Sequence, residues 1–289
     1  MHGDTNYRMF EFPIPVWQYA VYIQNYIMGV HNNFGPQILT PTWSLAVEEQ
    51  FYLIFPFLIY FIKPRFYYLL FLALVIVAIF SRIIVHGNFY KYYTWLPSRI
   101  DSLAVGGLLA WVKINWWPQF FEKHLRQRYN LSKMILVLLF LTMILLPNLV
   151  NIDISLKFSV VALAFGLLVL LVLEFDFIKR LLENSIIIFI GKISYGMYIY
   201  HQIINHVLHK IIFNSDPAIS NMNNTLVTGL SFFLTIFVSY FSFRYFERPL
   251  MNRGHRLTYK FSDGADSPAV FQFANVKEKL PVDKNGVKQ

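Results

Sequence analysis

The chain alternates long apolar runs with short polar connections, a pattern that predicts seven membrane-spanning helices. Each run comes close to the length of about 20 predominantly apolar residues that a spanning helix needs. The predicted spans are 45–62, 66–85, 99–116, 132–150, 157–175, 186–211 and 225–246. The expected fold class is therefore all-α, a polytopic bundle of transmembrane helices.

The connections between these spans alternate between basic and charge-poor, which predicts their orientation. Lys and Arg gather after the first, third, fifth and seventh spans, whereas the other connections carry few charges apart from Lys91. Because cytoplasmic loops are enriched in Lys and Arg, the C-terminus is expected in the cytoplasm and Trp43 on the outer side.

Two segments fall outside the pattern of spans. Residues 16–30 are apolar but short and polar-interrupted, which favours an interfacial or re-entrant segment. Residues 255–289 are rich in Asp, Gly, Lys and Pro, which is typical of a largely disordered tail. The expected divisions are an extracytoplasmic or interfacial segment, a transmembrane domain and a cytoplasmic tail, at 1–44, 45–250 and 251–289.

Composition agrees with a membrane protein and excludes several kinds of site. The chain is 56% hydrophobic and 14% charged, whereas soluble domains are about a quarter charged. Its net charge of +9 fits basic cytoplasmic loops, so no nucleic-acid partner is expected. The absence of cysteine excludes disulfides, thiol catalysis and cysteine-ligated metals, and we expect no metal and no bound cofactor.

Two adjacent carboxylates, Glu48 and Glu49, stand at the start of the first predicted span, before an uncharged run. A carboxylate at membrane depth is costly and indicates a functional site. Glu48 and Tyr52 are four residues apart, so they share one helical face and can share a polar cavity. The alternative is a pair of structural glutamates at a helix N-terminus capped by Ser44.

Charged residues recur at the outer mouth of the third predicted span. Arg99 and Asp101 are two residues apart, so they face different directions and each needs a partner on another helix. Gly106 and Gly107 are expected to let a neighbouring helix approach closely. Arg82 faces the same cavity or extends to the interface. The alternative for Arg99 is an ordinary interfacial arginine.

A polar stripe runs along the sixth predicted span. Ser194, Tyr198 and His201 fall at helical spacing, and such a stripe faces protein or water rather than lipid. The alternative for His201 is a hydrogen-bonded packing residue. His206 and His209, nearer the outer surface, are expected to be interfacial residues.

These three blocks resemble, in order, the motifs of the acyltransferase-3 family, membrane enzymes that O-acylate cell-surface sugars. The matches are Trp-Ser-Leu-x-x-Glu-x-x-x-Tyr at 43–52, Arg-x-Asp-x-x-x-x-Gly at 99–106 and Gly-x-x-Ser-Tyr-x-x-Tyr-x-x-His at 191–201. The resemblance implies a roughly ten-helix fold in a bacterial inner (plasma) membrane, with both termini cytoplasmic, of which this chain is the last part.

The resemblance also implies the reaction and its residues. An acyl group, acetyl above all, would pass from acetyl-CoA or another acyl-CoA, as co-substrate, to a hydroxyl of a cell-surface glycan or a lipid-linked sugar. The expected catalytic residues are Glu48, Tyr52, Arg99 and His201. The expected substrate contacts are Trp43, Ser44, Arg82, Asp101, Ser194, Tyr195 and Tyr198.

One part of the family pattern has no counterpart in the sequence. The family's catalytic histidine lies in a first helix that precedes the matched region, and neither His2 nor His31 stands in a comparable context. A separate N-terminal fragment is therefore an expected partner, beside acyl-CoA, the glycan and the bilayer. Two alternatives stay open, an inactive truncated remnant and a transporter of a glycolipid or small anion, and only the acyltransferase yields a covalent product.

Overall fold

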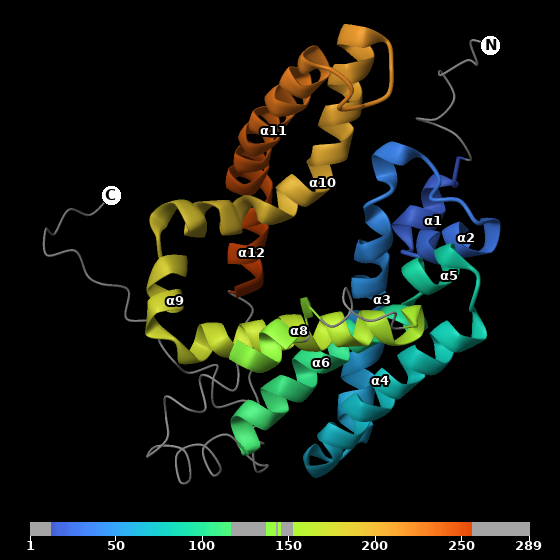
Figure 1. Cartoon of the computed structure of the whole chain (residues 1–289), viewed down its shortest axis with the longest axis vertical. Coiled ribbons are helices and arrows are strands. Elements are labelled where there is room, and N and C mark those ends of the chain that lie inside the picture. Colours follow the sequence, from blue (N-terminus) through green and yellow to red (C-terminus); the bar gives the residue numbers. More distant parts are fainter. Residues whose placement is uncertain (1–12, 117–136, 143, 146–152, 256–289) are drawn as a thin grey trace, which may run out of the picture. The chain divides into compact units, whose positions relative to one another are not determined.

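A computed structural model describes residues 13–116, 137–142, 144–145 and 153–255, and every regular element within them is a helix (Figure 1). The long helices are α3 (Thr42–Phe61), α4 (Tyr67–Ile84), α6 (Leu96–Asn115), α8 (Ile154–Glu174), α10 (Ser185–Phe213) and α11 (Met222–Ser242). The short helices are α1 (Val16–Ala20), α2 (Gln24–His31), α5 (Phe89–Thr94), α9 (Asp176–Leu182) and α12 (Arg248–His255). Single turns are η2 (Gln37–Leu39), η3 (Pro64–Phe66) and the π-helical η6 (Phe243–Glu247). The all-α fold class is confirmed.

Among the described residues, four helical segments are long and apolar enough to cross a membrane. They are Thr42–Phe61, Pro64–Ile84, Ile154–Leu173 and Met222–Gly254. These segments coincide with the first, second, fifth and seventh predicted spans, which confirms a polytopic membrane fold. Helices α6 and α10 cover the third and sixth predicted spans but carry more polar side chains. The fourth, 132–150, lies largely outside the described residues, so the number of spans stays a prediction.

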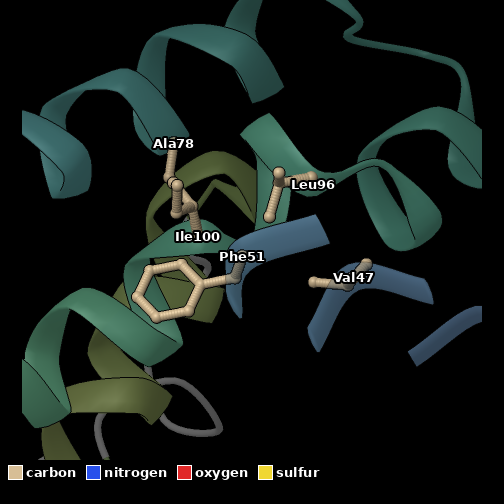
Figure 2. Packing of buried hydrophobic residues seen from close by; sticks show 5 residues of the cluster. All are labelled: Val47, Phe51, Ala78, Leu96 and Ile100. Carbon is tan, nitrogen blue, oxygen red and sulfur yellow. The ribbon is translucent and has the colours of Figure 1, made fainter. Parts of the chain in front are cut away.

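A small apolar core joins α3, α4 and α6, as Figure 2 shows. Its buried members are Val47, Phe51, Ala78, Leu96 and Ile100. Val47 and Phe51 are one helical turn apart, so α3 presents both on the same face. Phe51 also stacks on Phe55, with ring centroids 4.6 Å apart. This core places the N-terminal turns of α3 and α6, which carry the first two motif blocks, beside each other.

Two glycines allow the helices of this bundle to pack closely. A Cβ atom at Gly107 of α6 would overlap the ring of Phe71 on α4, and one at Gly166 of α8 would overlap Leu109 on α6. Both positions therefore exclude any larger side chain. Gly106 differs from the expectation, because a Cβ atom there would meet open space.

The segment preceding α3 forms short helices, and two polar side chains of α2, Gln24 and Asn25, are buried. Asn25 of α2 is fully buried, and its Nδ2 donates to the Thr94 carbonyl oxygen at 3.1 Å. Thr94 Oγ1 in turn donates to the Asn25 carbonyl oxygen at 2.9 Å. Gln50 Nε2 donates to Asn25 Oδ1 at 2.8 Å. These bonds fasten α2 to α5 and α3, over the end of α3 where Glu48 lies.

Helices α10 and α11 pack side by side (Figure 1) through polar as well as apolar side chains. His209 Nε2 lies 3.0 Å from Thr228 Oγ1, and Ser231 Oγ donates to Asn205 Oδ1 at 3.1 Å. His206 Nε2 lies 3.0 Å from the side-chain oxygen of Gln37 in η2. His206 and His209 are both buried, so they are hydrogen-bonded packing residues rather than exposed ones.

A second unit begins at Phe246, and α12 is its described helix. Its sequence is polar on one side and holds Arg248 and Arg253. The division at 250/251 between the transmembrane domain and the tail, like the division at 44/45, stays a prediction.

Candidate functional site

Arg82 and Asp101 form a fully buried ion pair between α4 and α6. Arg82 Nη2 lies 2.9 Å from Asp101 Oδ2, and neither side chain has exposed surface. Arg82 also donates to the carbonyl oxygens of Ser98 at 2.6 Å and Ser155 at 2.7 Å. Ser159 Oγ of α8 donates to Asp101 Oδ2 at 2.6 Å. Buried charges are tolerated when their hydrogen bonds are satisfied, as they are here.

The ion pair tests the sequence predictions for Asp101 and for Arg82. Asp101 has its partner on another helix, as predicted, whereas Arg82 does not extend to the interface as an exposed residue would. The pair bonds with groups of α4, α6 and α8, so it holds these three helices together. Its expected contact with substrate stays a prediction.

Arg99 lies among three aromatic rings that come from three other helices. Its Cζ is 4.4 Å from the ring centroid of Phe158 on α8, 5.6 Å from Tyr93 on α5 and 5.7 Å from Trp43 on α3. Ring faces attract a cation but do not neutralise its charge. Arg99 Nη1 is buried and has no hydrogen-bond partner in the described part of the chain. Arg99 therefore keeps a positive charge and a free donor.

Hydroxyl groups join the start of α3 to α10. Ser44 Oγ and Tyr198 Oη lie 2.6 Å apart, and the Tyr198 hydroxyl also donates to the Pro41 carbonyl oxygen at 2.9 Å. Glu48, one turn after Ser44, is partly buried and interacts electrostatically with the Tyr198 phenol. Glu49 is exposed. The two adjacent glutamates thus differ in environment, and Glu48, one turn after Ser44, is the partly buried one.

The predicted capping role of Ser44 is wrong. Helix α3 begins earlier, at Thr42, after Pro41, which makes no side-chain capping bond. Thr42 Oγ1 donates to the Leu39 carbonyl oxygen of η2 at 2.6 Å, so the preceding turn runs directly into the helix. Ser44 is consequently inside the first turn, where its hydroxyl can reach α10.

His201 has a defined orientation on α10. Its Nδ1 lies 2.7 Å from the Tyr198 carbonyl oxygen, one turn earlier. In the neutral imidazole, Nδ1 then carries the proton and Nε2 keeps a lone pair. His201 also lines a groove of about 520 Å³ between α10 and α11, together with Ser194 and Asn205. A neutral histidine of this tautomer can accept a proton.

Three predicted site residues do not join these contacts. Tyr52 is 57% exposed, and no hydrogen bond to Glu48 is found in the described ranges, so the two do not form the shared polar cavity that their spacing suggested. Tyr195 is 54% exposed. Ser194 Oγ donates to the Gly191 carbonyl oxygen at 2.8 Å, within its own helix. Their expected roles stay predictions.

The structure adds residues that the sequence motifs do not mark. Tyr93 interacts both with the residues around Arg99 and with the Ser44–Tyr198 hydroxyl pair. Its ring lies 4.8 Å from that of Trp43, and its phenol interacts electrostatically with Arg99 and Tyr198. Phe158 covers Arg99 and Ser159 completes the buried ion pair. One feature of the sequence could have marked Ser159: it is a polar residue within an apolar predicted span.

Together these side chains can perform acid–base and electrostatic chemistry. Glu48 and His201 can hold or accept a proton, and Arg99 can donate to an oxygen that becomes negatively charged. No group of three His, Cys, Asp or Glu that could hold a metal ion occurs within the described ranges. The chemistry that these side chains offer is proton transfer and oxyanion stabilisation.

Curated relatives are O-acetyltransferases by name. O-acetyltransferase OatA of Staphylococcus aureus, strain NCTC 8325, is 26% identical over 244 residues, which cover 78% of this chain and 38% of that protein. A second protein of the species, from strain COL and provisionally named an O-acetyltransferase, is 25% identical over 260 residues, 84% of this chain and 40% of its own length. The chain thus spans about two fifths of these relatives. No solved structure matches it.

The family assignment follows from the extent of the match. The model of the Acyltransferase domain family, Acyl_transf_3, matches residues 6–244, a stretch that includes all three motif blocks and every side chain of the site described above. The match covers most of the chain, and the fold is the polytopic α-helical one that the motifs imply. The chain therefore belongs to the acyltransferase-3 family.

Proposed function

We propose that this chain is a membrane O-acyltransferase, which moves an acyl group, acetyl above all, from acyl-CoA to a hydroxyl of a cell-surface or lipid-linked glycan. The observation that carries the proposal is the contact between the Ser44 and Tyr198 hydroxyls at the start of α3, one turn before the partly buried Glu48 and next to Trp43 of the aromatic cluster around Arg99. Family membership and the names of the relatives support it.

Each side chain has a part in the proposed reaction. The acceptor hydroxyl attacks the thioester carbonyl, a C–O bond forms, the C–S bond breaks, and the proton passes from the hydroxyl to a base while the thiolate leaves. His201 Nε2, which keeps a lone pair when Nδ1 carries the proton, acts as the base. Arg99 Nη1 stabilises the carbonyl oxygen as it becomes negative.

Glu48 acts as a charge partner for the acceptor and for the hydroxyl pair. A carboxylate accepts hydrogen bonds from sugar hydroxyls, and the Ser44 and Tyr198 hydroxyls provide further donors and acceptors. A separate N-terminal fragment that brings the family's histidine would make His201 an assisting residue instead. Because the basic loops are expected in the cytoplasm, acyl-CoA would approach from that side. The motif residues at the starts of α3 and α6 are expected on the outer side, so the acceptor glycan would approach from outside.

The first prediction concerns Glu48. Glu48→Gln keeps the size of the side chain and removes its charge, so we expect roughly a ten- to hundredfold loss of acylated product, the usual range for losing hydrogen bonds to a charged group. The matched control is Glu49→Gln, which changes the exposed neighbour and should cost much less. Product is measured as acyl mass added to surface glycan, in cells that express the chain together with the segments its longer relatives contain.

Membrane insertion of both variants is checked by fractionation, because loss of the protein would imitate loss of catalysis. Normal product from Glu48→Gln would remove Glu48 from the mechanism. Equal losses in the two variants would contradict the choice between the glutamates. Movement of glycolipid across the membrane without a covalent product would favour the transporter, and neither flux nor product would favour the inactive remnant.

A further inference from the structure

An elongated cavity, open along one side where Phe165 and Val169 are exposed, lies between α6 and α8, next to Arg99. Its volume is about 340 Å³, within the range of small-molecule sites. Arg99 and Ser102 form its polar end, and its apolar walls include Val105, Phe165 and Val169. The lining residues of α8 run from Phe158 to Val169, which corresponds to about 16 Å along the helix axis. The cavity therefore suits a narrow, extended and mainly apolar group.

Arg99, at the polar end of the cavity, is near the charge of Asp101 but makes no ion pair with any described residue. Asp101, the nearest carboxylate in sequence, accepts bonds from Arg82, Ser159 and the Ser102 amide. The close contacts of Arg99 are with the rings of Phe158, Tyr93 and Trp43, and its buried Nη1 has no hydrogen-bond partner among the described residues. A buried donor without a partner is costly, so the Arg99 guanidinium, which lines the cavity, is suited to an oxygen that arrives with a ligand.

We propose that this cavity holds the hydrocarbon chain of an acyl group, with the Arg99 guanidinium donating to its carbonyl oxygen. The inference rests on the proposed acyl transfer and adds the acyl class. An acetyl group would occupy only the Arg99 end, whereas the apolar walls continue past Val105 toward Val169. The chain is therefore built to accept medium-length acyl groups as well as acetyl.

Gly106 sets how long an acyl chain the cavity accepts. It lines the cavity, and a Cβ atom at this position would meet no atom within 4 Å. A larger side chain can thus be added without displacing either helix, and it would fill the space that an acyl chain needs. Gly229 of α11 has the same open surroundings but does not line the cavity, so Gly229→Leu is a matched control for Gly106→Leu.

Direct binding tests the cavity without turnover. The full chain in lipid nanodiscs is photolabelled with decanoic acid carrying a diazirine and an alkyne, whose carboxylate oxygen stands in for the acyl carbonyl oxygen. We expect peptides of α6 and α8 to be labelled. Gly106→Leu should lower this labelling roughly tenfold or more, as rejection by a filled apolar pocket does, whereas Gly229→Leu should leave it unchanged. Arg99→Gln, checked for an unchanged melting temperature, should also lower it.

Each of the following results would overturn or support the proposed acyl cavity. Labelling outside α6 and α8, or labelling that survives Gly106→Leu, overturns it. Displacement of the probe by phosphatidylglycerol but not by unlabelled decanoate overturns it in favour of a bilayer lipid. Acetyl transfer from acetyl-CoA without any from decanoyl-CoA overturns it while the proposed function stands. Specific labelling without any transfer supports the acyl cavity and contradicts the proposed function instead.

Discussion

Arg82 and Arg99 lie near the same end of the bundle, yet their environments are opposite. Arg82 is buried among an acid, a hydroxyl and two carbonyl oxygens, which satisfy its charge. Arg99 is surrounded by aromatic rings and keeps one free donor. The first arrangement stabilises the contacts between helices, and the second leaves a charge available for a ligand. The same residue type therefore serves packing in one case and is suited to chemistry in the other.

At the residue scale, the buried ion pair gives a prediction of stability. Asp101→Asn leaves the Arg82 charge without its counterion, which should lower the free energy of unfolding by about 3–5 kcal/mol. Replacing both partners with apolar residues, Arg82→Met with Asp101→Leu, should recover much of this loss, because no unpaired charge remains buried. Thermal unfolding in detergent measures both, and Glu49→Gln is the exposed control. An unchanged melting temperature for Asp101→Asn would contradict the structural role.

At the scale of one element, a capping hydrogen bond determines where α8, a helix that lines the site, begins. Asp153 caps α8, and its Oδ1 accepts the Ser155 amide N–H at 2.7 Å. The cap fixes where α8 begins, and hence where Phe158 and Ser159 face α6. Three further helices have asparagine caps at Asn88, Asn184 and Asn221, which do not titrate.

The cap of α8 should make stability depend on pH. Hydrogen bonding from Ser155, with the nearby His86 adding to it, holds the pKa of Asp153 below its ordinary value. A lowered folded-state pKa means that this contribution is present above the unfolded-state pKa and is lost as pH falls through the folded-state pKa. Asp153→Asn, which keeps a good cap, should match the original protein at neutral pH and lose less stability in acid. Melting temperatures across pH test this, and identical acid sensitivity would contradict it.

At the scale of the whole molecule, alternation of basic and charge-poor connections predicts the topology. Two residues in the described loops can show which side of the membrane each loop lies on. They are Lys63, between α3 and α4, and Ser215, between α10 and α11. The positive-inside rule places the first in the cytoplasm and the second outside.

The orientation can be measured directly because the chain contains no cysteine. Single substitutions Lys63→Cys and Ser215→Cys are treated in intact cells with a maleimide that cannot cross the membrane. We expect labelling at position 215 only, with labelling at 63 appearing after permeabilisation. Labelling at position 63 in intact cells would reverse the predicted orientation and place Glu48 on the cytoplasmic side.

The sequence by itself determined the elements and the family. Apolar runs of spanning length mark helices because a bilayer requires every backbone polar group to be bonded within the segment. The spacing of Ser194, Tyr198 and His201 marks one helical face for the same local reason. The three motif blocks identified the family that the comparisons then confirmed.

Only the tertiary structure decided which polar residues meet. Arg82 pairs with Asp101 nineteen positions away, and Ser44 reaches Tyr198 across 154 positions, contacts that no local period encodes. The distinction between Gly106, which faces open space, and Gly107, which packs on a ring, likewise depends on the neighbouring helix. The physical reason is that helix rotation and crossing set these contacts, and they depend on the packing of all side chains together.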